Sequence, residues 1–202
     1  ISKKVDTSDE WIKSRTGISQ RRISGLSENV SEMGYKAALG ALEMAKWEIE
    51  TIDLIILATS TPNDLFGSAP EIQSKLGAIN AVAFDLTAAC SGFLFAAITA
   101  AQFLKAGSYK RALVIGSDQL SSYVDWNDRR SCILFGDGAG AIAIEGTNEL
   151  DNLIGFIMRT DGQRGSFLNL PSQNNQDLII DDINFSSGGF SSIKMNGQEV
   201  YK

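Results

Sequence analysis

The 202-residue sequence contains no histidine, and it has only two cysteines and three prolines. The cysteines, Cys90 and Cys132, form no Cys-x-x-Cys pair, and no histidine is present to complete a zinc-binding set. This argues against a metal site and against a disulfide scaffold. The lack of histidine also removes the imidazole that enzymes most often use as a general base. A nucleophile in this chain must therefore be activated by backbone electrostatics or by groups outside it.

Basic residues are fewer than acidic ones, 18 against 24, and the net charge is −6. This balance argues against a nucleic-acid partner, because neutralising phosphates requires a clustered lysine and arginine face. No run approaches the roughly 20 apolar residues of a membrane span, so we expect no membrane partner. The composition, 44% hydrophobic and 21% charged, is typical of a globular protein, and the two unpaired cysteines favour a reducing cytosol.

Helical and strand patterns alternate along the first 159 residues. Thr7 and Glu10 have capping-box spacing and Gly17 is a typical helix stop, which predicts a helix over residues 7–15. Further helices are predicted at residues 27–46, 68–77 and 90–106, the last apolar nearly all round and therefore central in its domain. Short apolar runs predict strands at residues 53–59, 81–86, 111–115, 132–135, 139–145 and 154–159. The alternation predicts a three-layer α/β fold with a mixed, mostly parallel sheet flanked by helices.

Glycine recurs at every second position in the run Phe135-Gly136-Asp137-Gly138-Ala139-Gly140-Ala141. A dinucleotide-binding glycine loop must follow a strand and open a helix. Here the following residues have the pattern of a second strand instead. We therefore interpret the run as a tight hairpin turn between antiparallel segments, with close backbone packing.

The amino-acid composition of the sequence changes after residue 159. Residues 160–192 are rich in Gly, Ser, Asn, Gln and Asp, and we expect a connector or excursion there. Residues 193–202 have the pattern of the start of a further segment that includes a helix. The chain begins with Ile1 and stops inside that segment, so we interpret it as an excerpt of a longer polypeptide in which residues 1–159 form one domain.

Cys90 follows the predicted strand at residues 81–86 and stands at the start of the predicted helix over residues 90–106. Unpaired N–H groups and the helix dipole at such a position favour the thiolate over the free thiol, whose pKa is about 8.5. The flanking residues are small and permit a sharp turn and the approach of a substrate: Ala88, Ala89, Ser91 and Gly92. The pattern leaves two interpretations of Cys90, a nucleophile and a buried packing residue. Cys132 lies inside an apolar run, and for it packing is favoured.

Several segments, in order along almost the whole chain, resemble β-ketoacyl-acyl-carrier-protein synthase III, the family of initiating condensing enzymes of type II fatty-acid synthesis. The matching segments are residues 5–12, 15–18, 83–86, 88–93, 116–118, 135–141 and 195–200. The resemblance implies a thiolase-like fold, with this chain as the N-terminal half of a double αβαβα architecture that lacks its first strand. It also implies a bacterial cytosol or a plastid stroma as the compartment.

The resemblance assigns the two substrates of the first step. Cys90 would take an acetyl or another short acyl group from acyl-coenzyme A as a thioester. Trp11 is similar to the indole on which the adenine of coenzyme A stacks, and Arg129 would lie on the other face of that adenine. Thr7 and Arg15 are similar to the residues that contact the adenine and a phosphate group. Without the resemblance, Trp11 and Arg15 fit an ordinary surface helix. No resident cofactor is implied, because the coenzyme A thioester is a substrate.

The resemblance also implies a homodimer with a shared acyl pocket. Phe66 matches the aromatic residue that one subunit inserts into the pocket of its neighbour. Leu120 and Phe135 match residues that line the same pocket and limit the length of the primer. In the absence of the resemblance, Leu120 and Phe135 fit an ordinary core.

The second step implied by the resemblance is a decarboxylative condensation with malonyl-acyl-carrier protein, which yields a 3-ketoacyl-carrier protein. In the family this step uses a histidine and an asparagine from the half of the protein that is missing here. Loss of one such donor costs about 3 to 4 kcal/mol of transition-state stabilisation. We therefore expect the complete protein to be an acyltransferase that condenses, and the 202-residue excerpt to be unable to condense alone.

Two other interpretations remain open at the level of the sequence. The first is another enzyme of the thiolase fold, either an acyltransferase that does not decarboxylate or a condensing enzyme such as hydroxymethylglutaryl-coenzyme A synthase. The second is a non-catalytic α/β scaffold or coenzyme-binding module in which Cys90 only packs. The reactivity of Cys90 toward iodoacetamide, compared with that of Cys132, distinguishes the last interpretation from the enzymatic ones.

Overall fold

The structure, a computed structural model, describes residues 1–147, 153–180 and 183–201. These residues form two compact units, each made of separate stretches of the chain. The first unit comprises Ile1–Arg21, Leu120–Gly136 and Arg159–Lys202, and the second comprises Arg22–Gln119 and Asp137–Met158. The boundaries predicted at residues 159 and 192 were placed where the amino-acid composition changes, whereas the two units are defined by contacts between segments. Each unit is described below by itself.

The second unit is built on a four-stranded sheet in the order β2-β1-β3-β4. Its strands are β1 (Leu54–Ala58), β2 (Val82–Leu86), β3 (Arg111–Gln119) and β4 (Asp137–Glu145). Strand β1 pairs in parallel with β2 and β3, and β4 pairs antiparallel to β3. The sheet is thus mixed and mostly parallel, as the alternation of helices and strands predicted.

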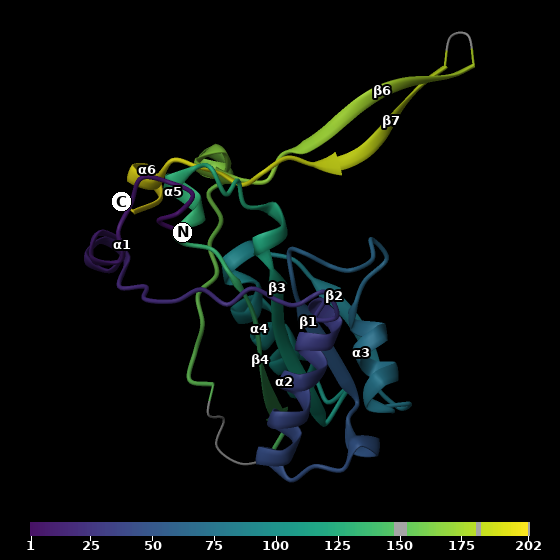
Figure 1. The fold of residues 1–202 in the computed structure, drawn as a ribbon. Coiled ribbons are helices and arrows are strands. Elements are labelled where there is room, and N and C mark those ends of the chain that lie inside the picture. Colours follow the sequence, from purple (N-terminus) through teal and green to yellow (C-terminus); the bar gives the residue numbers. More distant parts are fainter. Residues whose placement is uncertain (148–152, 181–182, 202) are drawn as a thin grey trace. The chain divides into compact units, whose positions relative to one another are not determined.

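Helices cover both faces of this sheet, with α2 (Val30–Ala45) and α3 (Ala69–Leu76) on one face and α4 (Gly92–Lys105) on the other (Figure 1). A short 3-10 helix, η1 (Ile49–Thr51), precedes β1. Side chains alternate across β1, so Ile55 and Leu57 pack with α2 and α3, while Leu54 and Ile56 pack with α4. All four are fully buried. Burial of one such side chain stabilises a fold by about 1.5 to 3 kcal/mol, which explains the unbroken apolar run in β1.

Glycines end two helices of this unit where the sequence predicted a stop. Gly77 follows α3 with φ of 73° and Gly107 lies just beyond α4 with φ of 76°, both in the left-handed region. Asn29 rather than Ser27 or Glu28 caps α2, since its side chain accepts from the backbone N–H of Glu32.

Two elements of the second unit are less buried than expected. Strand β2 is an edge strand with partly exposed side chains, not a strand buried on both faces. Helix α4 is not apolar-packed all round: its buried stripe is Gly92, Ala96, Ala100 and Leu104, whereas Leu94 is 64% exposed. Small residues in this stripe let the helix backbone approach the sheet closely, while Leu94 projects into solvent.

The first unit contains the N-terminal helix and the C-terminal strands. Its elements are α1 (Asp9–Thr16), η3 (Leu120–Tyr123), α5 (Arg129–Cys132), η4 (Gly162–Phe167), β5 (Leu168–Asn169), β6 (Ser172–Ile180), β7 (Ile183–Phe190), β8 (Lys194–Met195) and α6 (Gly197–Tyr201). Strands β6 and β7 form an antiparallel hairpin, and β5 pairs with β8. Its small core gathers Ile12, Val124, Cys132, Ile133 and Ile193.

Four sequence predictions fail in or next to this unit. Ser8, not Thr7, caps α1, because its hydroxyl accepts from the backbone N–H of Trp11 at 3.1 Å. Residues 132–135 are not a strand: Cys132 ends α5, so no hairpin joins them to β4, which pairs with β3 instead. The described residues of 154–159 form no strand. Residues 160–192, expected as a connector or excursion, contain the β6–β7 hairpin, and residues 181–182 lie outside the described ranges.

No helix within the described ranges is both long enough and apolar enough to cross a membrane.

Candidate active site

Cys90 lies where the chain turns from the sheet into α4. Strand β2 ends at Leu86, a 3-10 turn, η2 (Ala89–Ser91), carries Cys90, and α4 begins at Gly92. The side chain of Cys90 is exposed, so it is not the buried packing residue that the sequence left open. The free N–H groups and partial positive charge at the start of a helix favour negative charge on a group held there.

The backbone next to Cys90 is strained. Ala89 has φ of 47°, in the left-handed region that residues with a Cβ rarely adopt. Such a conformation costs of order 1 kcal/mol and persists only where the surrounding structure requires it. The start of α4 lies close to the end of β1, since a Cβ placed at Gly92 would lie 3.4 Å from the Cβ of Ala58.

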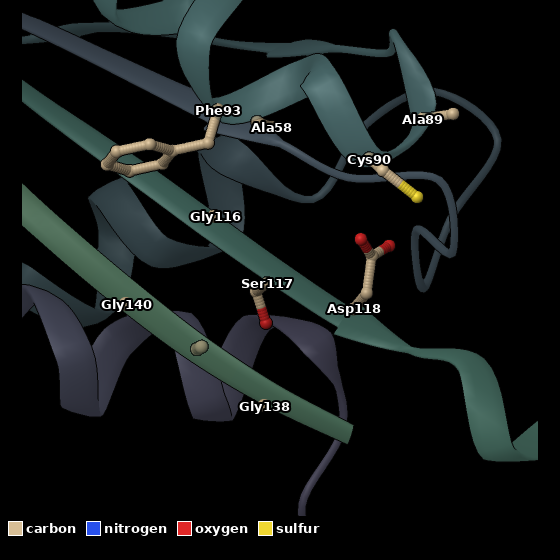
Figure 2. Close-up of a pocket in the computed structure, with 10 residues that line it drawn as sticks. Ala58, Ala89, Cys90, Phe93, Gly116, Ser117, Asp118, Gly138 and Gly140 are labelled. Carbon is tan, nitrogen blue, oxygen red and sulfur yellow. The ribbon is translucent and has the colours of Figure 1, made fainter. Parts of the chain in front are cut away.

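A pocket of about 200 Å³ opens beside Cys90, at the carboxyl ends of the parallel strands (Figure 2). Its floor consists of small residues in register on three neighbouring strands, since Gly116 pairs with Ala58 on one side and Gly140 on the other. A Cβ at Gly116 would lie only 3.1 Å from the ring of Phe93, which also lines the pocket. Glycine at this position therefore lets the Phe93 ring rest on the sheet.

The glycine-rich run contributes to this pocket, which the sequence did not predict. Gly138, Ala139 and Gly140 lie on β4 and line the pocket opposite Cys90. Their small side chains leave space at the wall instead of forming a hairpin turn. The alternation of glycine marks a strand against which a ligand can approach closely.

Asp118, near the end of β3, is the second functional residue that sequence reasoning missed. Its Oδ1 atom accepts three hydrogen bonds from the turn after β1, from Thr59 Oγ1 at 3.2 Å, Ser60 N at 2.8 Å and Thr61 Oγ1 at 3.1 Å. Figure 2 shows its carboxylate and the Cys90 sulfur directed toward each other across the pocket. The available signal was an acidic residue at the carboxyl end of a parallel strand, the edge at which such sheets bind ligands.

Phe66 lies in the second unit on the loop between β1 and α3, and its side chain is 99% exposed. The base of this loop is held firmly: Asn63 Oδ1 accepts from the N–H of Val30, and Asp85 accepts from the N–H groups of Ser68 and Ala69. The structure thus presents an apolar side chain on a well-anchored loop. Phe66 is not among the residues that line the Cys90 pocket.

The predicted coenzyme residues gather around Trp11 in the first unit. The guanidinium carbon of Arg129 lies 5.0 Å from the Trp11 ring centroid and that of Arg15 lies 6.0 Å from it. Arg129 also donates to the backbone carbonyl of Asp6 at 2.9 Å, which fixes its position. Within the described part of the chain, the Oγ1 atom of Thr7 is buried without a hydrogen-bond partner. The structure therefore brings together Trp11, Arg15 and Arg129 of this predicted group.

The remaining predicted residues lie in the core of the first unit. Leu120 and Phe135 are partly buried and pack against the cluster that contains Ile12 and Cys132. Cys132 is fully buried, and burial, together with the negative charge of Asp128, raises the pKa of its thiol. Packing is thus the role that the structure supports for Cys132, as expected.

Comparison with known proteins shows which enzymes the chain is similar to. A model of 3-oxoacyl-[acyl-carrier-protein] synthase III matches residues 84–162, which include Cys90 and Asp118. A β-ketoacyl-[acyl-carrier-protein] synthase III of Prochlorococcus marinus subsp. pastoris is 96% identical over all 202 residues. The chain is thus similar, over its whole length, to β-ketoacyl-acyl-carrier-protein synthase III proteins.

Solved structures of synthase III enzymes agree with this similarity and confirm the thiolase-like fold. The enzyme of Aquifex aeolicus superposes with a TM-score of 0.85 and is 40% identical, over 99% of this chain and 59% of its own. The enzyme of Thermus thermophilus superposes with a TM-score of 0.80 at 33% identity, over 99% of this chain and 60% of its own. The chain spans about 60% of the length of the curated relatives it matches.

Proposed function

We propose that the complete protein is the initiating condensing enzyme of type II fatty-acid synthesis. The observation that carries the proposal is Cys90, exposed in the 3-10 turn η2 just before α4 and beside a pocket at the carboxyl edge of the sheet. The similarity of the chain to synthase III proteins supports this assignment. The substrates are a short acyl-coenzyme A and malonyl-acyl-carrier protein.

The first step is the transfer of an acyl group to Cys90. Its sulfur attacks the thioester carbonyl carbon, the bond from that carbon to the sulfur of coenzyme A breaks, and coenzyme A leaves as a thiol with the proton that Cys90 loses. The N-terminal dipoles of α4 favour the attacking negative charge. Among the described residues, the backbone N–H of Cys90 donates to no acceptor, so it is free to stabilise the oxyanion that forms.

The coenzyme end of the substrate would bind at Trp11. An adenine stacked on the indole gains a planar apolar surface, with the guanidinium group of Arg129 on its other face, and Arg15 supplies positive charge for a phosphate group. A cation–π contact of this kind contributes about 0.5 to 2 kcal/mol. The unpartnered hydroxyl of Thr7 is available to a polar atom of the base. No resident cofactor or metal enters the proposed reaction.

The second step joins the acyl group on Cys90 to the malonyl unit as carbon dioxide leaves. The resemblance assigns the stabilisation of the malonyl thioester oxygen to a histidine and an asparagine outside this chain, and the chain itself contains no histidine. A histidine is therefore needed from elsewhere in the complete protein. Detection of condensed product from the purified 202-residue chain would contradict the proposal that condensation needs residues outside this chain.

A homodimer is part of the proposal. Phe66 is held on an anchored loop with its ring almost fully exposed, which is the arrangement of a side chain that inserts into a partner. A Phe66→Ala variant of the full-length protein should weaken dimerisation, measured by sedimentation, or change the preferred acyl length. An unchanged dimer with an unchanged preference would remove Phe66 from the interface.

The test of the first step is acyl-enzyme formation on the full-length protein. After incubation with acetyl-coenzyme A, intact and peptide masses should show one acetyl group on the peptide that contains Cys90. Cys90→Ser should abolish the adduct, while the matched Cys132→Ala variant should retain it, because Cys132 is buried in the first unit. An acetyl group on another residue, or none, would refute the proposed nucleophile.

A further inference from the structure

Asp118 places a negative charge in the pocket beside the nucleophile. It is the one side chain with a carboxylate among the ten residues that line the pocket, and none of those ten is a lysine or arginine. In the part of the chain that the structure describes, no ion pair neutralises it. The pocket therefore presents Cys90 to an incoming acyl group next to an uncompensated carboxylate.

The hydrogen bonds of Asp118 hold that carboxylate as an acceptor. Its Oδ1 atom takes donors from the turn at residues 59–61, and that atom acts only as an acceptor, as the oxygens of an ionised carboxyl group do. The Oδ2 atom has no donor within the described residues, and Figure 2 shows the group facing the Cys90 sulfur. One oxygen thus anchors the side chain while the other faces the pocket.

The charge of Asp118 bears on which groups can approach Cys90. The carboxylate repels other negative charges held in the same pocket. The helix dipole favours the thiolate, whereas Asp118 disfavours every negative charge beside it, including that of an anionic acyl group.

We propose that Asp118 is a specificity-determining residue that disfavours anionic acyl groups at Cys90, so that neutral short acyl thioesters acylate the enzyme. This inference rests on the proposed acylation of Cys90. The two substrates differ in charge: a malonyl thioester carries a terminal carboxylate and would compete with the neutral primer for the Cys90 sulfur. Repulsion by Asp118 would disfavour that competing acylation. In the transfer itself the acyl carbon gains the bond to Cys90 and loses its bond to the thiol of coenzyme A, whichever acyl group is offered.

The charge effect can be measured without any acyl substrate. Iodoacetamide and iodoacetate alkylate the same thiolate with release of iodide, but only the second reagent is anionic. The ratio of their rates at Cys90 therefore reports the local field and cancels changes in thiolate population. In the full-length protein, Asp118→Asn keeps Oδ1 as an acceptor for the turn and removes the charge, so the iodoacetate to iodoacetamide ratio should rise about tenfold. The matched variant Glu43→Gln, which removes an exposed charge on α2, should leave the ratio within about twofold.

A second measurement keeps the inference open to refutation if Asp118→Asn does not fold. In the unaltered protein the same ratio should rise with ionic strength, because salt screens repulsion of the anionic reagent only. The specificity itself is read from Cys90 acylation, where the malonyl to acetyl rate ratio should rise about tenfold in Asp118→Asn. If no variant is acylated at all, the proposed function fails, and the haloacetate ratio still decides the charge effect. A ratio that neither the substitution nor salt changes would overturn the role of Asp118.

Discussion

Removing the carboxylate of Asp85 should loosen the loop that carries Phe66. Asp85 lies on β2, and its two oxygens accept from the backbone N–H groups of Ser68 and Ala69 at 2.7 to 3.0 Å. These groups open α3, where Ser68 provides no side-chain cap. A side chain from the sheet therefore does the work of a helix cap, and it also fixes the end of the Phe66 loop.

The size of the effect follows from burial. Ser68 and Ala69 are almost completely buried, so Asp85→Ala would leave two N–H donors without an acceptor in a place that water does not reach. A buried unsatisfied donor costs about 1 to 3 kcal/mol, and the lost attraction between a carboxylate and a helix N-terminus adds about 0.3 to 1 kcal/mol. We expect a loss of about 3 kcal/mol for Asp85→Ala. Asp85→Asn keeps one acceptor oxygen and should lose about 1 kcal/mol.

Hydrogen exchange on the full-length protein measures this directly at residues 68–69, alongside the urea midpoint of unfolding. A loss of about 3 kcal/mol corresponds to roughly a hundredfold faster exchange of these amides. Glu71→Gln is the matched control, because it removes an exposed carboxylate from the first turn of α3 and should change stability by less than about 0.5 kcal/mol. Unchanged exchange at residues 68–69 in Asp85→Ala would refute the assignment of Asp85 as the cap.

Three further predictions concern the cysteines and the coenzyme site. At neutral pH, iodoacetamide should alkylate exposed Cys90 at least a hundredfold faster than buried Cys132, and equal rates would exclude an activated Cys90. Trp11→Ala should raise the KM for acetyl-coenzyme A about tenfold with little change in kcat, while Trp11→Phe restores most of the affinity. Because the pKa of the Cys132 thiol is raised, the folded state binds its proton more tightly, so stability should fall as pH rises above about 9. Cys132→Ala should remove that alkaline decline in urea titrations.

Local sequence patterns were sufficient to predict segments in which every residue is buried or in which buried residues recur at a regular spacing. The unbroken apolar run at residues 54–58 became the central strand β1, and the helix predicted at residues 68–77 is α3 (Ala69–Leu76). The same reasoning failed at residues 132–135. That run is apolar because Cys132 and Ile133 fill the core of the first unit from a short helix and its following turn, and apolarity alone does not distinguish such a turn from a buried strand.

The site shows the same limit. Cys90 could be singled out because its turn, its small neighbours and the helix after it are adjacent in the sequence. Asp118 and Gly138 could not be joined to it, because they enter the pocket only through the pairing of β3 with β1 and β4, between residues far apart in the chain. The face of α4 was misjudged for a related reason, since composition does not say which side of an apolar helix meets the sheet.

The amino-acid sequence by itself determined the alternating helices and strands, the place of the cysteine at a helix start, and the resemblance to synthase III proteins, because these depend on neighbours along the chain. Tertiary structure alone decided that a carboxylate faces the thiol, that glycines of β4 form the opposite wall, and that Asp85 caps a helix from another element. Contacts of this kind come from strand register and helix packing, which are set by the burial of the whole sheet rather than by any one segment.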